Sequence, residues 1–251
     1  MNITGNTVLI TGGATGIGFA LAEVFLKKDN DVIICGRRER KLKQAKRKLP
    51  GIHIKRFDVA KEKERQKLFR WVTSNFSDVN ILVNNAGIQR QFDFTSRKIV
   101  KPFHSKDDEI AVNLVAPIRL CALFTPNLSK KKKAAIVNIS SGLAFVPIAM
   151  MPIYCATKAA LHSFTVSLRH QLRNTTVRVF DVAPPTTDTE LDRSFAGEQE
   201  LGYRGITARE VATAIMEGIQ TDNEQIIIRQ AQDLYEASLQ NPGAIFKRLN
   251  G

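Results

Sequence analysis

Residues 7–18 read Thr7-Val8-Leu9-Ile10-Thr11-Gly12-Gly13-Ala14-Thr15-Gly16-Ile17-Gly18: a β-branched run, a glycine-rich turn and the start of a helical pattern. In such a strand–turn–helix unit Gly12 permits the tight turn, Gly16 lets the backbone approach a phosphate, and Gly18 lets the helix pack against the sheet. The helix N-terminus offers free N–H groups to a pyrophosphate. The stretch predicts a dinucleotide site that includes Thr15 and Ile17; the alternative is a glycine-rich turn that binds no ligand.

The same alternation of strand and helix continues along the chain. Short β-branched runs predict strands at residues 7–10, 31–34, 52–57, 81–83, 135–139, 177–180 and 226–228, and helical patterns lie at 17–28, 38–49, 61–76, 105–128, 153–173 and 207–220. The runs are almost continuously apolar, which indicates strands that are covered on both faces. We predict an α/β fold of the doubly wound, Rossmann type, with a seven-stranded parallel sheet and helices on both faces, as a single domain over residues 1–251.

Composition narrows the class of protein. Hydrophobic residues make up 43% of the 251 residues, which is enough for a core, and no apolar run approaches the length of a membrane span. The N-terminus lacks the pattern of a secretion signal, and the three cysteines form neither a pair motif nor a disulfide framework. The four histidines show no metal-ligand spacing. We expect a cytoplasmic protein with no membrane span and no metal.

The net charge of +13 allows two interpretations. A basic chain can bind nucleic acid or another anionic polymer, and such binding weakens steeply with salt. The basic residues are instead spread along the chain without a nucleic-acid motif, and the densest run, Lys130 to Lys133, falls where a helix is expected to end. We favour a solvated basic surface and expect no nucleic-acid partner.

The end of the second expected strand selects the cofactor. Folds that bind NAD place an acid there to hold the ribose 2′-hydroxyl. Here the strand ends in Gly36-Arg37-Arg38, and arginine is a forked, permanently charged donor for a 2′-phosphate. We predict NADP(H), with Arg37 as first choice and Arg38 as second; the alternative is an arginine at a helix start that faces solvent.

Two further strand ends add candidate cofactor contacts. Asp58-Val59 closes the third strand, and Asp58 either accepts from the adenine amino group or caps the helix that begins near Lys61. The fourth strand ends in Asn84 followed by Asn85, Ala86 and Gly87. Small residues and side-chain amides allow a loop to lie against a cofactor, although they also make an ordinary turn.

The candidate catalytic residues follow the fifth strand. Tyr154 and Lys158 are four residues apart, so they share one helix face, and Ser141 lies 13 residues before Tyr154 at a strand end. A phenol is a weak acid at neutral pH, but a nearby ammonium favours the phenolate and lowers the pKa of the phenol. Tyr154 can then exchange a proton with a substrate oxygen that Ser141 orients.

With these segments in place, the chain resembles the short-chain dehydrogenase/reductase family over residues 7 to about 228. The resemblance is carried by Thr11-Gly12-x-x-x-Gly16-x-Gly18, Asn84-Asn85-Ala86-Gly87, Asn113, Ser141 and Tyr154-x-x-x-Lys158. It implies that Tyr154 is the general acid–base, that Lys158 holds the nicotinamide ribose and tunes Tyr154, and that Ser141 positions the substrate. It also implies that Asn113 supports a water chain to Lys158; from the residues alone, Asn113 is an ordinary polar residue of a helix.

The chain departs from the family pattern after the sixth strand. The family has Pro-Gly there and a Thr a few residues further on, whereas this chain reads Pro184-Pro185-Thr186-Thr187-Asp188-Thr189. The resemblance places Thr189 at the nicotinamide carboxamide and Pro184 and Thr187 along the cofactor, while Pro185 removes an N–H and backbone freedom. The Pro-Pro pair is similar to a bacterial subgroup encoded beside teichoic-acid D-alanylation genes. The loops near 88–104 and 184–206 are candidate substrate walls.

The expected helices at 105–128 and 153–173 carry apolar residues on more than one face, which suggests a partner subunit. The family forms dimers and tetramers through these helices, so we expect a homodimer or a homotetramer. The predicted function is hydride transfer between NADP(H) and a small carbonyl or alcohol substrate. The alternative is an NADP-binding redox sensor without catalysis.

Overall fold

The computed structural model describes residues 1–95, 108–193 and 205–251. One sheet contains β1 Thr7–Thr11, β2 Asp31–Gly36, β3 His53–Arg56, β4 Val79–Asn84, β5 Ala134–Ile139, β6 Val177–Ala183 and β9 Gln225–Ile227, and a second pairs β7 Thr187–Asp188 with β8 Ile206–Thr207. The helices are α1 Gly16–Leu26, α2 Glu39–Lys48, α3 Glu62–Asn75, α4 Ala116–Leu128, α5 Pro152–Leu172, α6 Glu190–Arg193, α7 Ala208–Gln220, α8 Gln230–Gln240 and α9 Pro242–Asn250. A π-helical turn, η2 Ala111–Val115, precedes α4, and a 3-10 turn, η3 Gly142–Ala144, follows β5.

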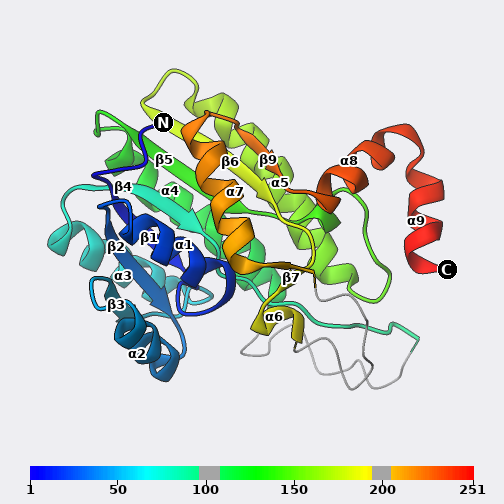
Figure 1. Cartoon of the computed structure of the whole chain (residues 1–251), viewed down its shortest axis with the longest axis horizontal. Helices are drawn as coiled ribbons and strands as arrows, with labels where there is room; N and C mark the ends of the chain where they lie inside the picture. Colours follow the sequence, from blue (N-terminus) through cyan, green and yellow to red (C-terminus); the bar gives the residue numbers. More distant parts are fainter. Residues whose placement is uncertain (96–107, 194–204) are drawn as a thin grey trace.

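The large sheet confirms the predicted doubly wound, Rossmann-type architecture (Figure 1). Its seven strands run in the order β3-β2-β1-β4-β5-β6-β9, and all neighbouring pairs are parallel. The strand order reverses between β1 and β4. Open α/β sheets bind ligands at such a switch point, beyond the carboxyl ends of the strands.

Alternate side chains of each strand enter two separate cores. Val8 and Ile10 of β1 pack on the side that carries α1, α2 and α7, whereas Leu9 packs on the side of α3, α4 and α5. Figure 1 shows α1 and α7 over the near face of the sheet. The central strands are therefore covered on both faces, which explains their nearly continuous apolar sequences.

One helical stretch, Ala111–Leu128, is apolar and long enough to cross a membrane by length and composition, with a mean hydropathy of 1.3. In the fold, 44% of this stretch is buried. Leu120, Phe124 and Leu128 pack in the core with α3 and β4 residues. We interpret its apolar character as that of a core helix. The first three residues of the helix predicted over 105–128 lie outside the described residues.

The C-terminal helices α8 and α9 were not predicted, because their sequences lack a strong apolar period. Ala231 at the start of α8 is fully buried against Gly142 of η3. At the end of α9, Asn250 Nδ2 donates to the carbonyl of Pro147, and the N–H of Ala149 donates to Asn250 Oδ1. These helices therefore cover the loop between β5 and α5.

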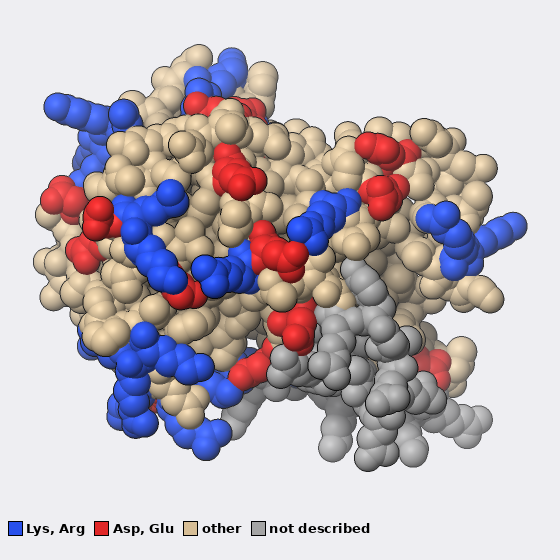
Figure 2. All heavy atoms as spheres, viewed as in Figure 1, with Lys and Arg blue, Asp and Glu red and all other residues tan. Residues whose placement is uncertain are grey.

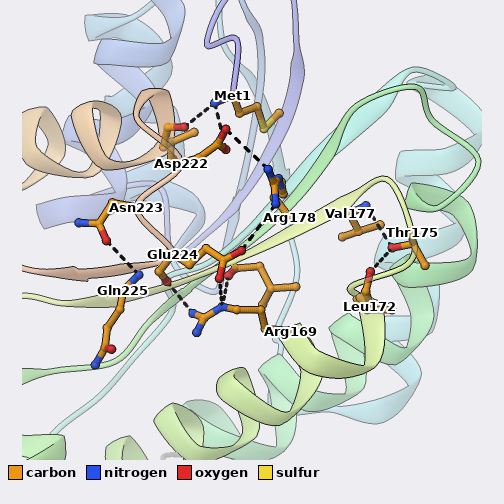
Figure 3. Close-up of polar contacts among 12 residues, drawn as sticks. Met1, Arg169, Leu172, Thr175, Val177, Arg178, Asp222, Asn223, Glu224 and Gln225 are labelled. Carbon is orange, nitrogen blue, oxygen red and sulfur yellow. Dashed lines mark hydrogen bonds and ion pairs between the residues drawn. The ribbon is translucent and has the colours of Figure 1, made fainter.

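A charged cluster closes the amino end of the sheet (Figure 3). The N-terminal ammonium lies 3.1 Å from Asp222 Oδ1, and Arg169 Nε lies 3.4 Å from Glu224 Oε2. Arg178 contacts both carboxylates, at 3.8 Å and 3.7 Å. The cavity of about 670 Å³ at this end is lined by these paired charges. The cluster holds the N-terminus, α5, β6 and the residues before β9 together, far from the carboxyl edge.

Basic residues spread over the visible face of the molecule, with acidic residues among them (Figure 2). A group of Lys and Arg side chains lies over α2, whose sequence is Glu39-Arg-Lys-Leu-Lys-Gln-Ala-Lys-Arg-Lys48. This distribution supports a solvated basic surface, and the absence of a nucleic-acid partner stays a prediction.

Packing of α1 under α7 depends on Phe25, which is fully buried. Phe25→Ala is expected to lower the free energy of unfolding by about 3–5 kcal/mol, because it removes a buried ring and leaves a cavity. Urea unfolding followed by circular dichroism measures the change. The control is Phe246→Ala on α9, where the ring is 41% exposed and the expected change is within about 0.5 kcal/mol. An equal loss of unfolding free energy in both variants would contradict the proposed contribution of Phe25 to the packing of α1 and α7.

Candidate active site

The glycine-rich turn leaves no room for a side chain at Gly12 and Gly18 and little room at Gly16. Gly12 and Gly16 adopt φ values of 65° and 56°, a region that favours glycine. A Cβ on Gly12 would lie 2.9 Å from Cα of Ala86, and one on Gly18 would lie 2.4 Å from Nδ2 of Asn85. Gly18 thus meets the end of β4 and the turn itself. The bare turn at the N-terminus of α1 fits a dinucleotide phosphate, which needs close approach to the backbone.

Gly16 faces the loop that follows β6. A Cβ built on Gly16 would lie 3.2 Å from the Cβ of Thr189. Thr15 is the N-cap residue of α1, and Ile17 is half-buried in its first turn. The structure therefore places Thr189, the predicted nicotinamide contact, directly beside Gly16 of the predicted phosphate turn.

The end of β4 is fastened to the end of β1. Thr11 Oγ1 accepts from the N–H groups of Asn85 and Ala86, each at 3.0 Å. Asn85 Nδ2 donates in return to the carbonyls of Thr11 and Gly12. A Cβ on Gly87 would lie 3.6 Å from Asn113 Oδ1 and 3.7 Å from Lys158 Nζ. The segment 85–87 therefore runs from the glycine turn to the candidate catalytic residues.

Arg38, at the start of α2, reaches across the glycine turn. Its guanidinium donates to Glu190 Oε2 at 2.8 Å and to Thr15 Oγ1 at 3.2 Å. Lys41 also pairs with Glu190, and the Lys41 ammonium, followed by Arg38, holds the pKa of this carboxyl below its usual range. Two cations beside the glycine turn, those of Arg38 and Lys41, thus pair with the carboxylate of Glu190. Arg37 is half-buried, and its carbonyl accepts from Arg56 Nε at 3.3 Å.

Asp58 is not the cap of α3. Its Oδ1 accepts from the N–H of Ala60 at 3.1 Å, while the N-cap residue of α3 is Lys61, without a side-chain cap. The Asp58 N–H donates to Glu64 Oε2. Val59 is buried, and its carbonyl accepts from Arg65. The capping alternative is therefore wrong, and the adenine contact stays a prediction.

Tyr154 and Lys158 lie in the first two turns of α5 and are 7% and 4% exposed. Lys158 Nζ is 5.6 Å from the centroid of the Tyr154 ring and donates to the carbonyl of Ile139 at 2.7 Å. Burial lowers the pKa of Lys158 to about 8, and the charge of Asp181 opposes this effect. The Lys158 amine thus lies close to the Tyr154 phenol, and burial brings its pKa closer to neutral pH.

Ser141 follows β5 and is the N-cap of η3. Its Oγ accepts from the N–H of Leu143 at 3.1 Å, which leaves the hydroxyl proton available to another acceptor. The side chain is buried at the same carboxyl edge as Tyr154. A substrate oxygen is one acceptor that such a hydroxyl can orient.

Asn113 lies in the π-helical turn η2, where the sequence predicted ordinary helix. Its Oδ1 accepts from the N–H of Ile88 at 2.9 Å, and its Nδ2 donates to the carbonyl of Ile88 at 2.8 Å and to Thr157 Oγ1 at 3.2 Å. Asn113 therefore joins the segment after β4 to α5. Single π turns are frequent at functional sites.

Glu109, one turn before Asn113, is a residue that the sequence analysis missed. It is 3% exposed, and its Oε1 accepts from the N–H of Arg90 at 3.1 Å. Burial raises the pKa of Glu109 to about 7. Ile88, Arg90 and Phe92 each donate their N–H outward, to Asn113, Glu109 and the carbonyl of Met150. The signal that was available is the spacing of Glu109 and Asn113, four residues apart on one helix face.

The Pro184-Pro185 loop is fixed at both ends. The Pro184 carbonyl accepts from the N–H of Gly142 at 3.0 Å, and the Pro185 carbonyl accepts from Thr187 Oγ1 at 2.8 Å. Thr187 then starts the β7–β8 pair. Of the two predicted substrate walls, residues 96–104 and 194–204 lie outside the described residues.

Two other polar groups near the site were not predicted. Lys41 lies one turn beyond Arg38, and Asp181 is a carboxylate inside the apolar strand β6 that contacts His162. A lone acid in a buried strand was a signal for Asp181, but its partner on α5 was not readable from the chain. The three cysteines are free and buried.

Comparison with known proteins places this geometry in a family. The family model for short chain dehydrogenases matches residues 6–200. The uncharacterized oxidoreductase DltE of Bacillus subtilis is 46% identical over 250 residues, covering 100% of this chain and 98% of that protein, in agreement with the resemblance of the Pro-Pro pair. Serine 3-dehydrogenase of Rhizobium radiobacter is 32% identical and covers 83% of this chain and 86% of that protein.

Solved structures agree over the whole fold. A short chain dehydrogenase from Burkholderia cenocepacia in complex with NADP has a TM-score of 0.83 and 25% identity, and covers 99% of each chain. A short-chain dehydrogenase from Sphingobium yanoikuyae in complex with NADPH has a TM-score of 0.78 and 25% identity, and covers 94% of each chain. This chain is an oxidoreductase that belongs to the short-chain dehydrogenase/reductase family.

Proposed function

We propose that this protein is an NADP(H)-dependent oxidoreductase that transfers a hydride between nicotinamide and a small carbonyl or alcohol substrate, with Tyr154 as the acid–base. The observation that carries the proposal is the pair of buried side chains on α5, with Lys158 Nζ 5.6 Å from the Tyr154 ring centroid. Gly87 and Asn113 lie beside the same amine. These residues meet at the carboxyl edge of the sheet, where the fold class binds its ligands.

The nicotinamide supplies or accepts the hydride when the cofactor is bound. The Tyr154 hydroxyl gives a proton to the substrate oxygen in reduction and takes one from it in oxidation. The Lys158 ammonium stabilises the phenolate that this transfer creates, and therefore lowers the pKa of the phenol. The Ser141 hydroxyl orients the substrate oxygen, and Asn113 holds Ile88, the neighbour of Gly87, which lies beside the amine.

Three cations support NADP(H) over NAD(H). Arg37, Arg38 and Lys41 follow β2, where a 2′-phosphate-binding protein needs positive charge. The pairing of Glu190 with both Arg38 and Lys41 indicates that these side chains can hold an anion. Structural neighbours are in complex with NADP and NADPH but also with NAD and NADH, so the choice of NADP(H) rests on these cations. Asp58, Val59, Pro184, Thr187 and Thr189 are the remaining proposed cofactor contacts.

We place the protein in the cytoplasm as a single domain that forms a homodimer or homotetramer. Ile110 and Val166, on the two helices expected to meet a partner, are 40% and 45% exposed. A sensor that binds NADP without turnover is the alternative function. The joint presence of Ser141, Tyr154 and Lys158 at one edge of the sheet argues against it, since binding alone needs no acid–base group.

Tyr154→Phe is expected to reduce turnover by at least about 100-fold, because the ring stays but the transferred proton is lost. NADPH affinity, measured by fluorescence titration, is expected to stay within about twofold. NADPH oxidation is measured over a panel of ketones and aldehydes. NADPH binding without turnover of any substrate by the wild-type protein would favour the sensor, and substantial residual activity in the variant would refute the role of Tyr154.

Arg37→Asp is expected to move cofactor preference from NADPH toward NADH, since a carboxylate repels a 2′-phosphate and accepts from a ribose hydroxyl. The ratio of kcat/KM for the two cofactors measures the change. Arg40→Asp is the matched control: it makes the same charge change on the exposed face of α2. An unchanged ratio for Arg37→Asp, with a shift for Arg38→Asp, would assign the phosphate to Arg38.

Gly16→Val is expected to abolish cofactor binding, because its side chain fills the space between the turn and Thr189. Gly5→Val is the control, since Gly5 has a similar φ of 68° but nothing within 4 Å of a built Cβ. Both variants carry backbone strain, and only Gly16→Val is expected to lose NADPH in calorimetric titration. Equal affinity in the two variants would remove the phosphate from this turn.

A further inference from the structure

A row of polar side chains crosses the sheet directly beneath the candidate catalytic residues. Asn84 of β4, Asn138 of β5 and Asp181 of β6 are register partners on neighbouring strands. Asn84 Nδ2 donates to Asn138 Oδ1 at 2.8 Å, and Asn138 Nδ2 donates to Thr165 Oγ1 of α5 at 2.9 Å. The row therefore faces the helix that carries Tyr154 and Lys158.

Asp181 is the charged member of this row and is only 1% exposed. Its Oδ2 lies 2.5 Å from His162 Nδ1, which carries the shared proton when the carboxylate is ionised. Its Oδ1 has no hydrogen-bond partner among the described residues. A buried carboxylate with one unsatisfied oxygen requires compensation by a cation, because burial strongly penalises an isolated charge.

Lys158 is a buried amine on α5, the helix that packs against β6 and this carboxylate. Lys158 and His162 are four residues apart on α5, so they share a helix face. Lys158 donates to the carbonyl of Ile139, whose register partner on β6 is Val182, the residue that follows Asp181. Among the described residues, the hydrogen bond to Ile139 is the only one that the amine makes.

The electrostatics of the pair agree with this placement. Burial lowers the pKa of Lys158, and the charge of Asp181 is the one effect that raises it. The titratable groups on the elements packed around this region include Tyr154, Cys155 and His162 on α5, Asp181 on β6 and the buried Glu109 before η2; of these, Asp181 is the one whose charge acts on the pKa of the amine. Asp181 is therefore the counter-charge on which the ammonium state depends.

We propose that Asp181, held by His162, is a positioning residue that keeps Lys158 protonated during catalysis. The proposal rests on the proposed function of Tyr154 and Lys158. Neither Asp181 nor His162 contacts the reacting atoms. The Asp181 carboxylate supplies negative charge to the environment of the Lys158 amine, and the His162 imidazole fixes the orientation of that carboxylate. Without that charge, Lys158 loses its proton at lower pH, and Tyr154 loses the cation that stabilises its phenolate.

The test is the pH profile of kcat/KM for Asp181→Asn, which keeps the shape and an acceptor for His162 but removes the charge. The fall of kcat/KM at high pH is expected to begin about one pH unit lower than in the wild type. At pH values above this point, the variant is then roughly tenfold less active than the wild type. Asp181→Glu restores the charge and is expected to return this fall toward its wild-type position. Superimposed profiles for wild type and Asp181→Asn would overturn the proposal.

Asp31→Asn is the matched control. Asp31 contacts His53 Nε2 at 3.1 Å in an exposed pair at the start of β2, far from Lys158, and its profile is expected to match that of the wild type. A Tyr154→Phe variant that retained activity would refute the proposed function itself, whereas an inactive Tyr154→Phe with an unshifted Asp181→Asn would refute only the role of Asp181.

A second readout does not need turnover. In protein with isotopically labelled lysine, the Cε chemical shift of Lys158, assigned by comparison with Lys158→Met, reports the protonation of the amine. Its titration midpoint is expected to fall by about one pH unit in Asp181→Asn. If that variant does not fold, Asp181→Ala removes the same charge and carries the same expectation. An unchanged midpoint in the folded variant would overturn the proposal.

Discussion

The ammonium of Lys158 is buried at the carboxyl edge of a parallel sheet, and the surrounding structure is arranged to keep it there. A charge removed from water is costly unless nearby groups replace the lost solvation. The carbonyl of Ile139 at the end of β5 accepts from the amine, the charge of Asp181 on β6 acts to raise the pKa of Lys158, and the Tyr154 ring lies beside the amine. Gly87 lies beside it, because a Cβ there would be at contact distance, 3.7 Å from Nζ. The chemistry assigned to Tyr154 depends on this one buried cation.

The loops around the amine are held by polar side chains from other elements. Thr11 fastens the end of β4 to the end of β1, and Asn113 and Glu109 hold alternate N–H groups of the extended segment after it. Alternate residues of an extended chain and residues four apart on a helix have similar spacings, so the two elements match. These contacts hold the segment in one conformation beside the candidate active site and leave the Glu109 carboxyl buried.

On the side of the site where the cofactor is proposed to bind, the charged groups are partly exposed rather than buried. Arg38, Lys41 and Glu190 are partly exposed and balance one another across the glycine turn. Exposed ion pairs contribute little to stability, so these contacts add little to the folding free energy. The contact also links α6, in the loop after β6, to the start of α2. The two predicted functions of these regions, cofactor selection and substrate enclosure, are therefore physically connected.

Short-range patterns in the amino-acid sequence determined much of this fold. Apolar β-branched runs, the turn at Gly12–Gly18 and the spacing of Tyr154 and Lys158 are short-range patterns, and they specify strands, a phosphate turn and a shared helix face without knowledge of the rest. Other contacts could not be predicted from short-range patterns. They are the pairing of Asp181 with His162, the hydrogen bond from Arg90 to Glu109, the ion pairs of Glu190 and the packing of α8 and α9 over the loop after β5. Each joins residues that are far apart in the chain or lie in segments with a weak period, and only the register of parallel strands and the packing of helices on them bring such groups into contact.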